Sequence, residues 1–141
     1  MSGLVVDTSV WIDLFRQHDT GPVRMLRKLF EQRLPYGITG VIYQEVLQGA
    51  RSEMDFDKLR EYLGTQCFYH PKESVGSYAE AARLYADCRR QGITIRSTID
   101  CLIARIAIEH ELTLLHSDKD YIYLAQIDPR LKLTNLADYE S

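Results

Sequence analysis

The sequence predicts an α/β fold in which helices flank a central, mainly parallel sheet. Short, mostly apolar runs alternate along the chain with longer segments in which apolar residues recur at helical spacing. The clearest runs are Leu4-Val5-Val6 and Leu112-Thr113-Leu114-Leu115, and each has the character of a strand that is covered on both faces. Strands that alternate with helices in this way form parallel sheets.

The segments also have boundary signals. Hydroxyl residues that can cap a helix precede several helical stretches, and glycine or proline marks several ends. The expected elements are, in chain order, a strand at residues 3–7, a helix capped by Thr8 or Ser9, a helix from Gly21-Pro22, a short strand near Ile38, a helix from Thr39 to about Gly49, a helix at 55–63, a strand at 67–70, a helix at 74–91, a helix capped by Ser97 or Thr98 and ending near His110, a strand at 112–115, a short helix at 118–125 and a last strand at 131–133.

Length and composition fit one ordinary globular domain, residues 1–141, with 45% apolar and 26% charged residues and hence no need of disulfides for stability. The three cysteines are odd in number and widely spaced, which argues against a disulfide framework or a zinc site and for a reducing compartment. No apolar run approaches the ~18 residues of a membrane span, and the first run is too short for a signal peptide. We therefore expect a cytoplasmic protein with a loose tail at residues 138–141.

Four acidic residues stand beside apolar elements. Asp7 ends the first strand, Glu45 interrupts the apolar third helix, Asp100 opens the helix before the fourth strand, and Asp118 follows that strand. Acids rarely lie beside buried segments unless something pairs with them. No basic residue is adjacent to Asp7, Glu45 or Asp100 in the sequence, so a divalent cation is the candidate partner.

The acids are expected to converge. Ligands of open α/β sheets bind beyond the carboxyl ends of the parallel strands, where Asp7 and Asp118 should lie, and early helical turns can bring Glu45 and Asp100 to the same edge. At ~4 Å and an effective dielectric near 20, each like-charged pair costs about 4 kcal/mol. A hard dication relieves this repulsion better than protonation does, so we predict Mg²⁺ or Mn²⁺, which can activate water and polarise a phosphate.

Each acid alone also has an ordinary explanation. Asp100 could interact with the amide groups at a helix N-terminus, Glu45 could be a solvated helix residue, and Asp118 could cap a helix. Asp7 is the hardest to explain in this way, because an acid at the end of a buried strand is costly unless it is used or capped. The four acids as a set favour a site.

Overall charge does not exclude nucleic acid as a partner. The net charge of −3 becomes +2 when five acids are set aside as ligands of a cation. The distribution of charge therefore matters more than its sum. These five acids are Asp7, Glu45, Asp100, Asp118 and Asp120.

The acids lie in four segments that resemble the motifs of one family. The segments are Asp7-Thr8-Ser9-Val10-Trp11-Ile12-Asp13, Glu45-Val46-Leu47-Gln48-Gly49-Ala50, Ile99-Asp100-Cys101-Leu102-Ile103-Ala104 and Leu114-Leu115-His116-Ser117-Asp118-Lys119-Asp120-Tyr121. In this order they resemble the acidic blocks of PIN-domain proteins of the VapC toxin group, over about residues 3 to 125. One block would be a weak signal, but four in register are specific.

The resemblance implies a PIN-like three-layer fold and a Mg²⁺- or Mn²⁺-dependent endoribonuclease that acts on structured RNA such as tRNA or rRNA. Proteins of this group are toxins that a cognate, VapB-like antitoxin holds inactive, and they form homodimers. The resemblance thus implies three partners for this chain: RNA, an antitoxin and a second copy of the chain.

The resemblance also assigns roles to residues. Departures from the family pattern are Tyr121, where Phe is common, and Ser117, where Asn is frequent. The implied catalytic and metal-binding acids are Asp7, Glu45, Asp100 and Asp118, with Asp120 as an extra metal-binding acid and Ser9 as an assisting polar residue.

A site made of carboxylates repels RNA until a cation is bound, so affinity for phosphate is expected from its rim. Candidate RNA-binding residues are Arg89, Arg90 and Arg96, which flank the third acidic segment, although solvated helix surfaces are the simpler explanation for any one of them. The antitoxin could bind the apolar helix surfaces around Trp11, Phe15, Leu26 and Phe30, for which packing in the core is an equal alternative.

Three other classes of protein are alternatives. A phosphotransferase of the haloacid dehalogenase kind also has an acid after its first strand, but it needs a second Asp two residues later, where this chain has Ser9. A structure-specific DNA nuclease of PIN architecture is a closer alternative. An inactive module that binds RNA or protein is the third, and the presence of all four acids weighs against it.

Overall fold

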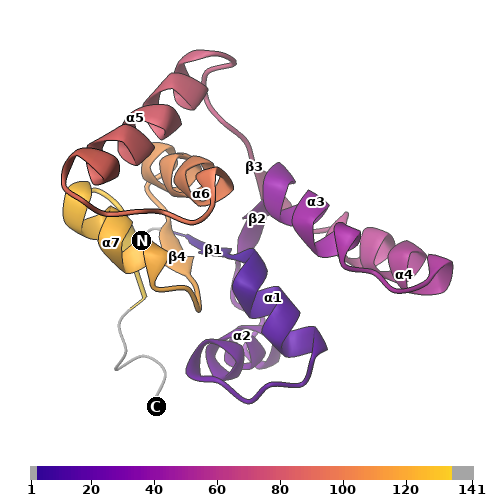
Figure 1. Ribbon diagram of the computed structural model, residues 1–141. Helices are drawn as coiled ribbons and strands as arrows, with labels where there is room; N and C mark the ends of the chain where they lie inside the picture. Colours follow the sequence, from indigo (N-terminus) through magenta and orange to yellow (C-terminus); the bar gives the residue numbers. More distant parts are fainter. Residues whose placement is uncertain (1–2, 135–141) are drawn as a thin grey trace.

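The computed structural model describes residues 3–134, and this part of the chain forms one five-stranded sheet with helices around it (Figure 1). The elements are, in order, β1 (Leu4–Val6), α1 (Thr8–Phe15), α2 (Gly21–Glu31), β2 (Gly37–Thr39), α3 (Gly40–Gln48), α4 (Glu53–Leu63), β3 (Cys67–Tyr69), α5 (Gly76–Arg90), α6 (Thr98–Glu109), β4 (Thr113–Leu115), α7 (Asp120–Ile127) and β5 (Lys132–Leu133). The expected tail at residues 138–141 lies outside the described residues.

The sheet is parallel, as predicted, and its strand order is β3-β2-β1-β4-β5. The register aligns Val5 of β1 with Gly37 of β2 on one side and with Leu114 of β4 on the other. The chain therefore builds outwards from β1 in one direction and later adds β4 on the opposite side. Ligand sites of open α/β sheets form at such a reversal, beyond the carboxyl ends of the two strands involved.

The helices form layers on either side of the sheet. Figure 1 shows α5, α6 and α7 together on one side, and α1 to α4 on the other. The two groups meet beyond the carboxyl ends of the strands, where α3 also contacts α6. This arrangement is the three-layer α/β fold that the resemblance implied.

The core explains why the central runs are apolar. Val5, Val6, Leu114 and Leu115 are fully or almost fully buried, as expected for strands covered on both faces. Trp11 is also fully buried and donates its indole N–H to the Val6 carbonyl at 3.2 Å.

Burial corrects part of the expected antitoxin surface. Trp11 and Leu26 belong to the core, as the alternative explanation had it, and Phe30 packs partly against them. Of this group, Phe15 at the end of α1 is the one whose ring is largely exposed.

The start of α1 differs from the prediction. Its N-cap is Asp7, not Thr8 or Ser9, because the Asp7 carboxylate accepts a hydrogen bond from the Ser9 backbone N–H. Asp7, Thr8 and Ser9 can each cap a helix, and Asp7 takes this role because the helix begins directly after it. Thr8 and Ser9 are left free to use their hydroxyl groups elsewhere.

Three other helices begin away from the expected residue. Helix α4 starts at Glu53, where Ser52 caps it, and α5 starts at Gly76. Helix α7 begins at Asp120, two residues later than predicted, because the Asp118 carboxylate accepts from the Asp120 backbone N–H and closes a turn before the helix. Asp118 thus lies in a loop with its side chain directed by that turn.

The described residues also show the state of the cysteines and the character of the helices. Cys88 and Cys101 are buried and Cys67 is exposed, all three as free thiols. No helix among residues 3–134 combines the length and the apolar character that crossing a membrane requires.

Candidate metal centre

Asp7 lies at the carboxyl end of β1, on the side of the fold that also carries Glu45, Asp100, Asp118 and Asp120; we call this the acidic edge. It follows β1, its backbone N–H donates to the Leu115 carbonyl at 2.9 Å, and the residue is only 3% exposed. Its Oδ2 accepts from the backbone N–H and the hydroxyl of Ser9, at 3.0 and 2.6 Å, and its Oδ1 accepts from the Tyr121 hydroxyl at 2.6 Å. Three donors therefore fix the orientation of a buried carboxylate.

Glu45 approaches this edge from α3. Its Oε1 accepts from the Thr8 hydroxyl at 2.7 Å, which ties α3 to the first turn of α1. Burial raises the pKa of the Glu45 carboxyl; the Thr8 hydrogen bond lowers it and the charge of Asp7 raises it further. The Thr8 hydrogen bond thus holds the Glu45 carboxylate next to the residue that follows Asp7.

Asp100 is in the first turn of α6, as predicted, after the N-cap Ser97. Burial raises its pKa to about 7, with repulsion from Asp7 and Asp118 as the next causes. The Tyr121 hydroxyl lies 3.3 Å from its Oδ1 and opposes this shift. A pKa this high means that the surroundings of Asp100 disfavour its ionised, negatively charged form.

Asp118 and Asp120 both pair with the guanidinium group of Arg96. The Arg96 Nη2 donates to Asp118 Oδ1 at 2.9 Å, and the Arg96 Nε lies 3.3 Å from Asp120 Oδ2. The backbone N–H of Arg96 also donates to Asp120 Oδ2, at 3.1 Å. Asp120 is buried, whereas the Arg96 side chain is 67% exposed.

The donor set fits a hard cation. Asp100, Asp118 and Asp120 each offer one oxygen within 4.8 Å of the others, and Asp7 reaches Asp100 through the Tyr121 hydroxyl. Among residues 3–134, no arginine or lysine pairs with Asp7 or Asp100. Asp118 and Asp120, by contrast, pair with Arg96. Carboxylate oxygens are the ligands that Mg²⁺ and Mn²⁺ prefer.

The candidate RNA-binding arginines lie in different settings. Arg96 is directed to the acids, as described above. Arg90 at the end of α5 pairs with Asp87 on its own helix, and Arg89 lies over the Tyr85 ring, with its guanidinium carbon 5.7 Å from the ring centroid. The described contacts of Arg89 and Arg90 are thus within α5, and those of Arg96 are at the acidic edge.

Sequence reasoning missed several polar residues that organise this edge. Ser9 was expected to assist, and its hydroxyl indeed joins Asp7 to the Ser117 backbone N–H, which donates to it at 3.0 Å. Such roles for Thr8 and Tyr121 were not expected, whereas His116 was expected as a polar edge residue and not as a ligand. The His116 ring packs edge-on against Tyr121, and its Nδ1 accepts from the Asp118 backbone N–H.

Little in the sequence alone could have found these residues. Tyr121 was noted as a departure from the family pattern, which was the one available signal. Thr8 is next to Asp7, but its partner Glu45 is 37 residues away. The pairing depends on how α1 and α3 cross, which periodicity does not reveal.

With this geometry in hand, comparison with known proteins defines the class. Residues 4–127 match the family model of the PIN domain. The chain therefore belongs to the PIN-domain family. It is 30% identical over 125 residues to the VapC ribonuclease Mb1587 of Mycobacterium bovis and to the ribonuclease VapC11 of Mycobacterium tuberculosis, and each match covers 88% of this chain and 92% of the relative. This similarity places the chain among the VapC proteins of that family.

Solved structures share the fold at lower identity. The similar chain in VapBC2 from Rickettsia felis, bound to a DNA fragment from their promoter, has a TM-score of 0.70 at 20% identity and covers 94% of this chain and 97% of its own. The similar chain in VapBC-1 from nontypeable Haemophilus influenzae has a TM-score of 0.71 at 17% identity and covers 95% and 98%. FitAcB from Neisseria gonorrhoeae contains a third, with a TM-score of 0.68 at 18% identity and coverage of 95% and 98%. The chain thus shares the fold of these chains from the VapBC and FitAcB structures.

Proposed function

We propose that this protein is the toxin of a toxin–antitoxin pair and a metal-dependent endoribonuclease that cleaves structured RNA. The observation that carries the proposal is the clustering of Asp100, Asp118 and Asp120 near the point where the strand order reverses. Asp7 is linked to Asp100 through the Tyr121 hydroxyl, and Glu45 is held by Thr8, the residue after Asp7. The relatives named ribonucleases support the same reaction class.

The metal would be held by Asp7, Glu45, Asp100 and Asp118, with Asp120 as an additional acid and Ser9 orienting Asp7. Bound there, Mg²⁺ or Mn²⁺ would supply an activated water and stabilise negative charge on the phosphoryl oxygens. Burial, followed by repulsion from Asp7 and Asp118, raises the pKa of Asp100, and such an ion would offset that repulsion.

The residues of the chain prepare this step. Ser9 and Tyr121 hold Asp7 still, and Thr8 holds Glu45, so the carboxylates need little reorganisation when a cation arrives. Attack of water on phosphorus leaves a 5′-phosphate and a 3′-hydroxyl. Products with a 2′,3′-cyclic phosphate would contradict the proposal, because they require the 2′-hydroxyl of the substrate to attack.

The decisive experiment incubates the purified chain with total cellular RNA in Mg²⁺, in Mn²⁺ or in EDTA and maps the cut ends. We expect cleavage with metal, none with EDTA, and loss of cleavage and of growth toxicity in Asp7→Asn. Asp19→Asn is the control, because Asp19 is an exposed acid that pairs with Arg24 and should leave activity unchanged. Unchanged cleavage by Asp7→Asn would refute the enzymatic proposal, and faster cleavage of flapped DNA than of folded RNA would favour the DNA nuclease.

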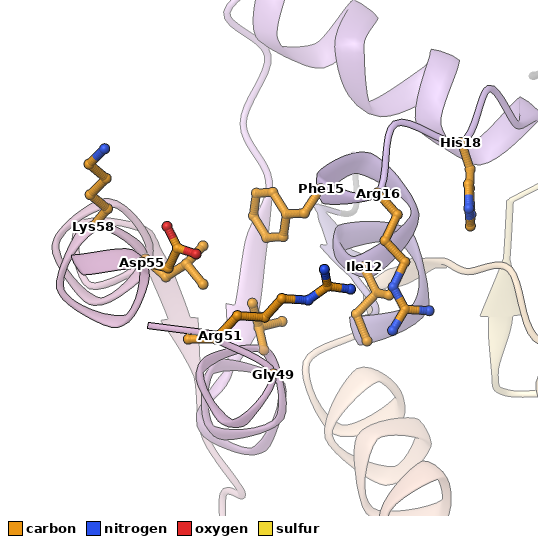
Figure 2. Close-up of a pocket in the computed structure, with 11 residues that line it drawn as sticks. Ile12, Phe15, Arg16, His18, Gly49, Arg51, Asp55 and Lys58 are labelled. Atoms are coloured by element: carbon orange, nitrogen blue, oxygen red, sulfur yellow. The ribbon is translucent and has the colours of Figure 1, made fainter. Parts of the chain in front are cut away.

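The same proposal includes a VapB-like antitoxin, since the structural neighbours come from VapBC complexes. A groove of about 730 Å³ lies between α1 and the α3–α4 pair and offers room for a segment of a partner (Figure 2). Its lining includes the apolar Ile12 and Phe15 from α1. Of its charged residues, Arg16, Arg51 and Lys58 are basic and Asp55 is acidic, so basic charge is in excess. An antitoxin segment with apolar and acidic side chains fits this lining.

Three further expectations belong to the proposal: a single PIN domain over residues 1–141, a homodimer and a cytoplasmic location. The resemblance to the VapC group supports the dimer. Light scattering coupled to size-exclusion chromatography tests it, and a monomer at micromolar concentration would contradict it.

A further inference from the structure

One hydroxyl group lies between two of the proposed metal-binding acids. Tyr121 is in the first turn of α7, and its side chain is fully buried. Its hydroxyl contacts Asp7 Oδ1 at 2.6 Å and Asp100 Oδ1 at 3.3 Å. It therefore joins the end of β1 to the start of α6.

The two contacts are unequal, and a tyrosine hydroxyl has one hydrogen to donate. The shorter contact is that of a strong O–H···O⁻ bond, so the hydrogen goes to Asp7. Asp100 has the longer and weaker contact with the same hydroxyl. The hydroxyl thus does two things: it orients Asp7, and it keeps the two carboxylates apart at a set distance.

The ring cannot move to relax this arrangement. It has no exposed surface, and the His116 ring packs edge-on against it with ring centroids 5.4 Å apart. His116 is itself held, because its Nδ1 accepts from the Asp118 backbone N–H at 3.2 Å. The position of the hydroxyl is thus coupled to the loop that carries a third acid.

We propose that Tyr121 is a positioning residue of the metal centre, whose hydroxyl sets Asp7 and Asp100 at the separation and orientation in which both face one divalent cation. This inference rests on the proposed metal centre, but not on RNA being the substrate. Groups that orient metal ligands in this way commonly change metal affinity about 10- to 100-fold when removed.

The test is direct Mn²⁺ binding to the full chain, measured by titration calorimetry without RNA. Tyr121→Phe keeps the ring and its packing against His116 and removes only the hydroxyl. We expect about 10-fold weaker Mn²⁺ binding. Cleavage should require correspondingly more Mn²⁺ and recover toward the wild-type rate at saturation. Tyr123→Phe is the matched control, because Tyr123 lies on the same helix with its side chain partly exposed, and it should bind Mn²⁺ like the wild type.

A double-mutant cycle guards against a change of fold. In an Asp7→Asn background, where the main acceptor is neutral, Tyr121→Phe should have a much smaller effect on Mn²⁺ affinity. An unchanged Mn²⁺ affinity in Tyr121→Phe, or an equal loss in both backgrounds, overturns the proposal. If the wild-type chain binds Mn²⁺ but cuts no RNA, the ribonuclease proposal fails and the proposed role of Tyr121 stands. If the wild-type chain binds no Mn²⁺, both proposals fail.

Discussion

The Arg96 guanidinium donates to the Asp118 carboxylate at 2.9 Å, so a cation of the chain itself lies at the acidic edge. Through its Nε and its backbone N–H, Arg96 also holds Asp120. Most of the side chain nevertheless faces solvent. Arg96 therefore anchors two acids and at the same time offers positive charge where a phosphate would approach.

Removing this anchor should impair the reaction. We expect Arg96→Gln to lower the rate of RNA cleavage about 10-fold, because Asp118 and Asp120 lose the group that orients them. Arg96→Lys keeps the positive charge but not the forked donors of the guanidinium, so its cleavage rate should lie between those of the wild type and Arg96→Gln. Single-turnover cleavage measures both variants, with Arg24→Gln, from an exposed ion pair, as the control.

The salt dependence of the same variants separates two roles of Arg96. If Arg96 contacts an RNA phosphate, binding through that contact releases a counterion from the RNA. Arg96→Gln would remove this release, so the slope of log affinity for RNA against log salt concentration should become shallower by about one unit. An unchanged slope with a reduced rate means that Arg96 acts only through the acids. Wild-type rate and slope in Arg96→Gln would contradict both roles.

The stability of the metal-free protein should fall as the pH rises. Burial, with repulsion from Asp7 and Asp118, raises the pKa of Asp100 from 3.8 to about 7. The folded state thus prefers the protonated form, and the contribution of this group is full below its unfolded pKa and is lost as the pH rises through about 7. After allowance for the partial exposure of Asp100, we expect a loss of about 2 kcal/mol.

Urea unfolding in EDTA, compared between wild type and Asp100→Asn across this pH range, measures the effect. The difference in unfolding free energy between the two proteins should grow with pH in favour of the variant. Mn²⁺ affinity of the wild type should rise over the same range, because the proton must leave before the carboxylate binds a metal. A difference that stays constant with pH would exclude an elevated pKa for Asp100.

The strands and the principal acids were within reach of the sequence, because apolar runs mark buried strands and an acid after such a run is costly unless used. The roles of Arg96 and Tyr121 were not. Arg96 was expected at a basic rim, yet its partners are 22 and 24 residues away and meet it only after α6 and β4 have packed. Tyr121 reaches across 114 residues to Asp7.

Away from the centre, Glu109 should matter for stability. Its side chain is 6% exposed and accepts from the Ser77 hydroxyl, the Lys72 backbone N–H and the Arg105 Nε, at 2.6, 2.9 and 3.0 Å. We expect Glu109→Gln to lower the free energy of unfolding by about 2 kcal/mol, because hydrogen bonds to a buried charge are lost. Urea unfolding tests this, and Glu80→Gln, from an exposed pair with Arg83, should change stability by less than about 0.5 kcal/mol.

The groove beside α1 should bind the antitoxin through charge as well as apolar contact. Figure 2 shows the Arg51 side chain extending toward α1 near Phe15, and Arg16 also lines the groove. No ion pair joins either arginine to an acid of residues 3–134. We expect Arg51→Glu to weaken antitoxin binding at least about 10-fold, because desolvated like charges repel. Titration calorimetry measures the affinity, with Arg60→Glu on the exposed surface of α4 as the control.

RNA cleavage by the free toxin shows whether this groove binds the antitoxin or the RNA strand. Arg51→Glu should cleave RNA like the wild type once the antitoxin is absent. A parallel loss of cleavage would assign the groove to the RNA strand instead. Normal antitoxin affinity in Arg51→Glu would show that the groove is not part of that interface.

The pairing of β1 with β4 aligns Leu4 with Thr113, so the first and the fourth strand become neighbours only when most of the chain has left the ribosome. A nascent chain that has emerged as far as α5 carries Asp7 and Glu45 but neither Asp100 nor Asp118. Such a chain has two of the four acids, and its β1 lacks the β4 partner on one edge. We therefore expect prematurely terminated products to be harmless and quickly degraded, so that only a nearly finished polypeptide endangers the cell that makes it.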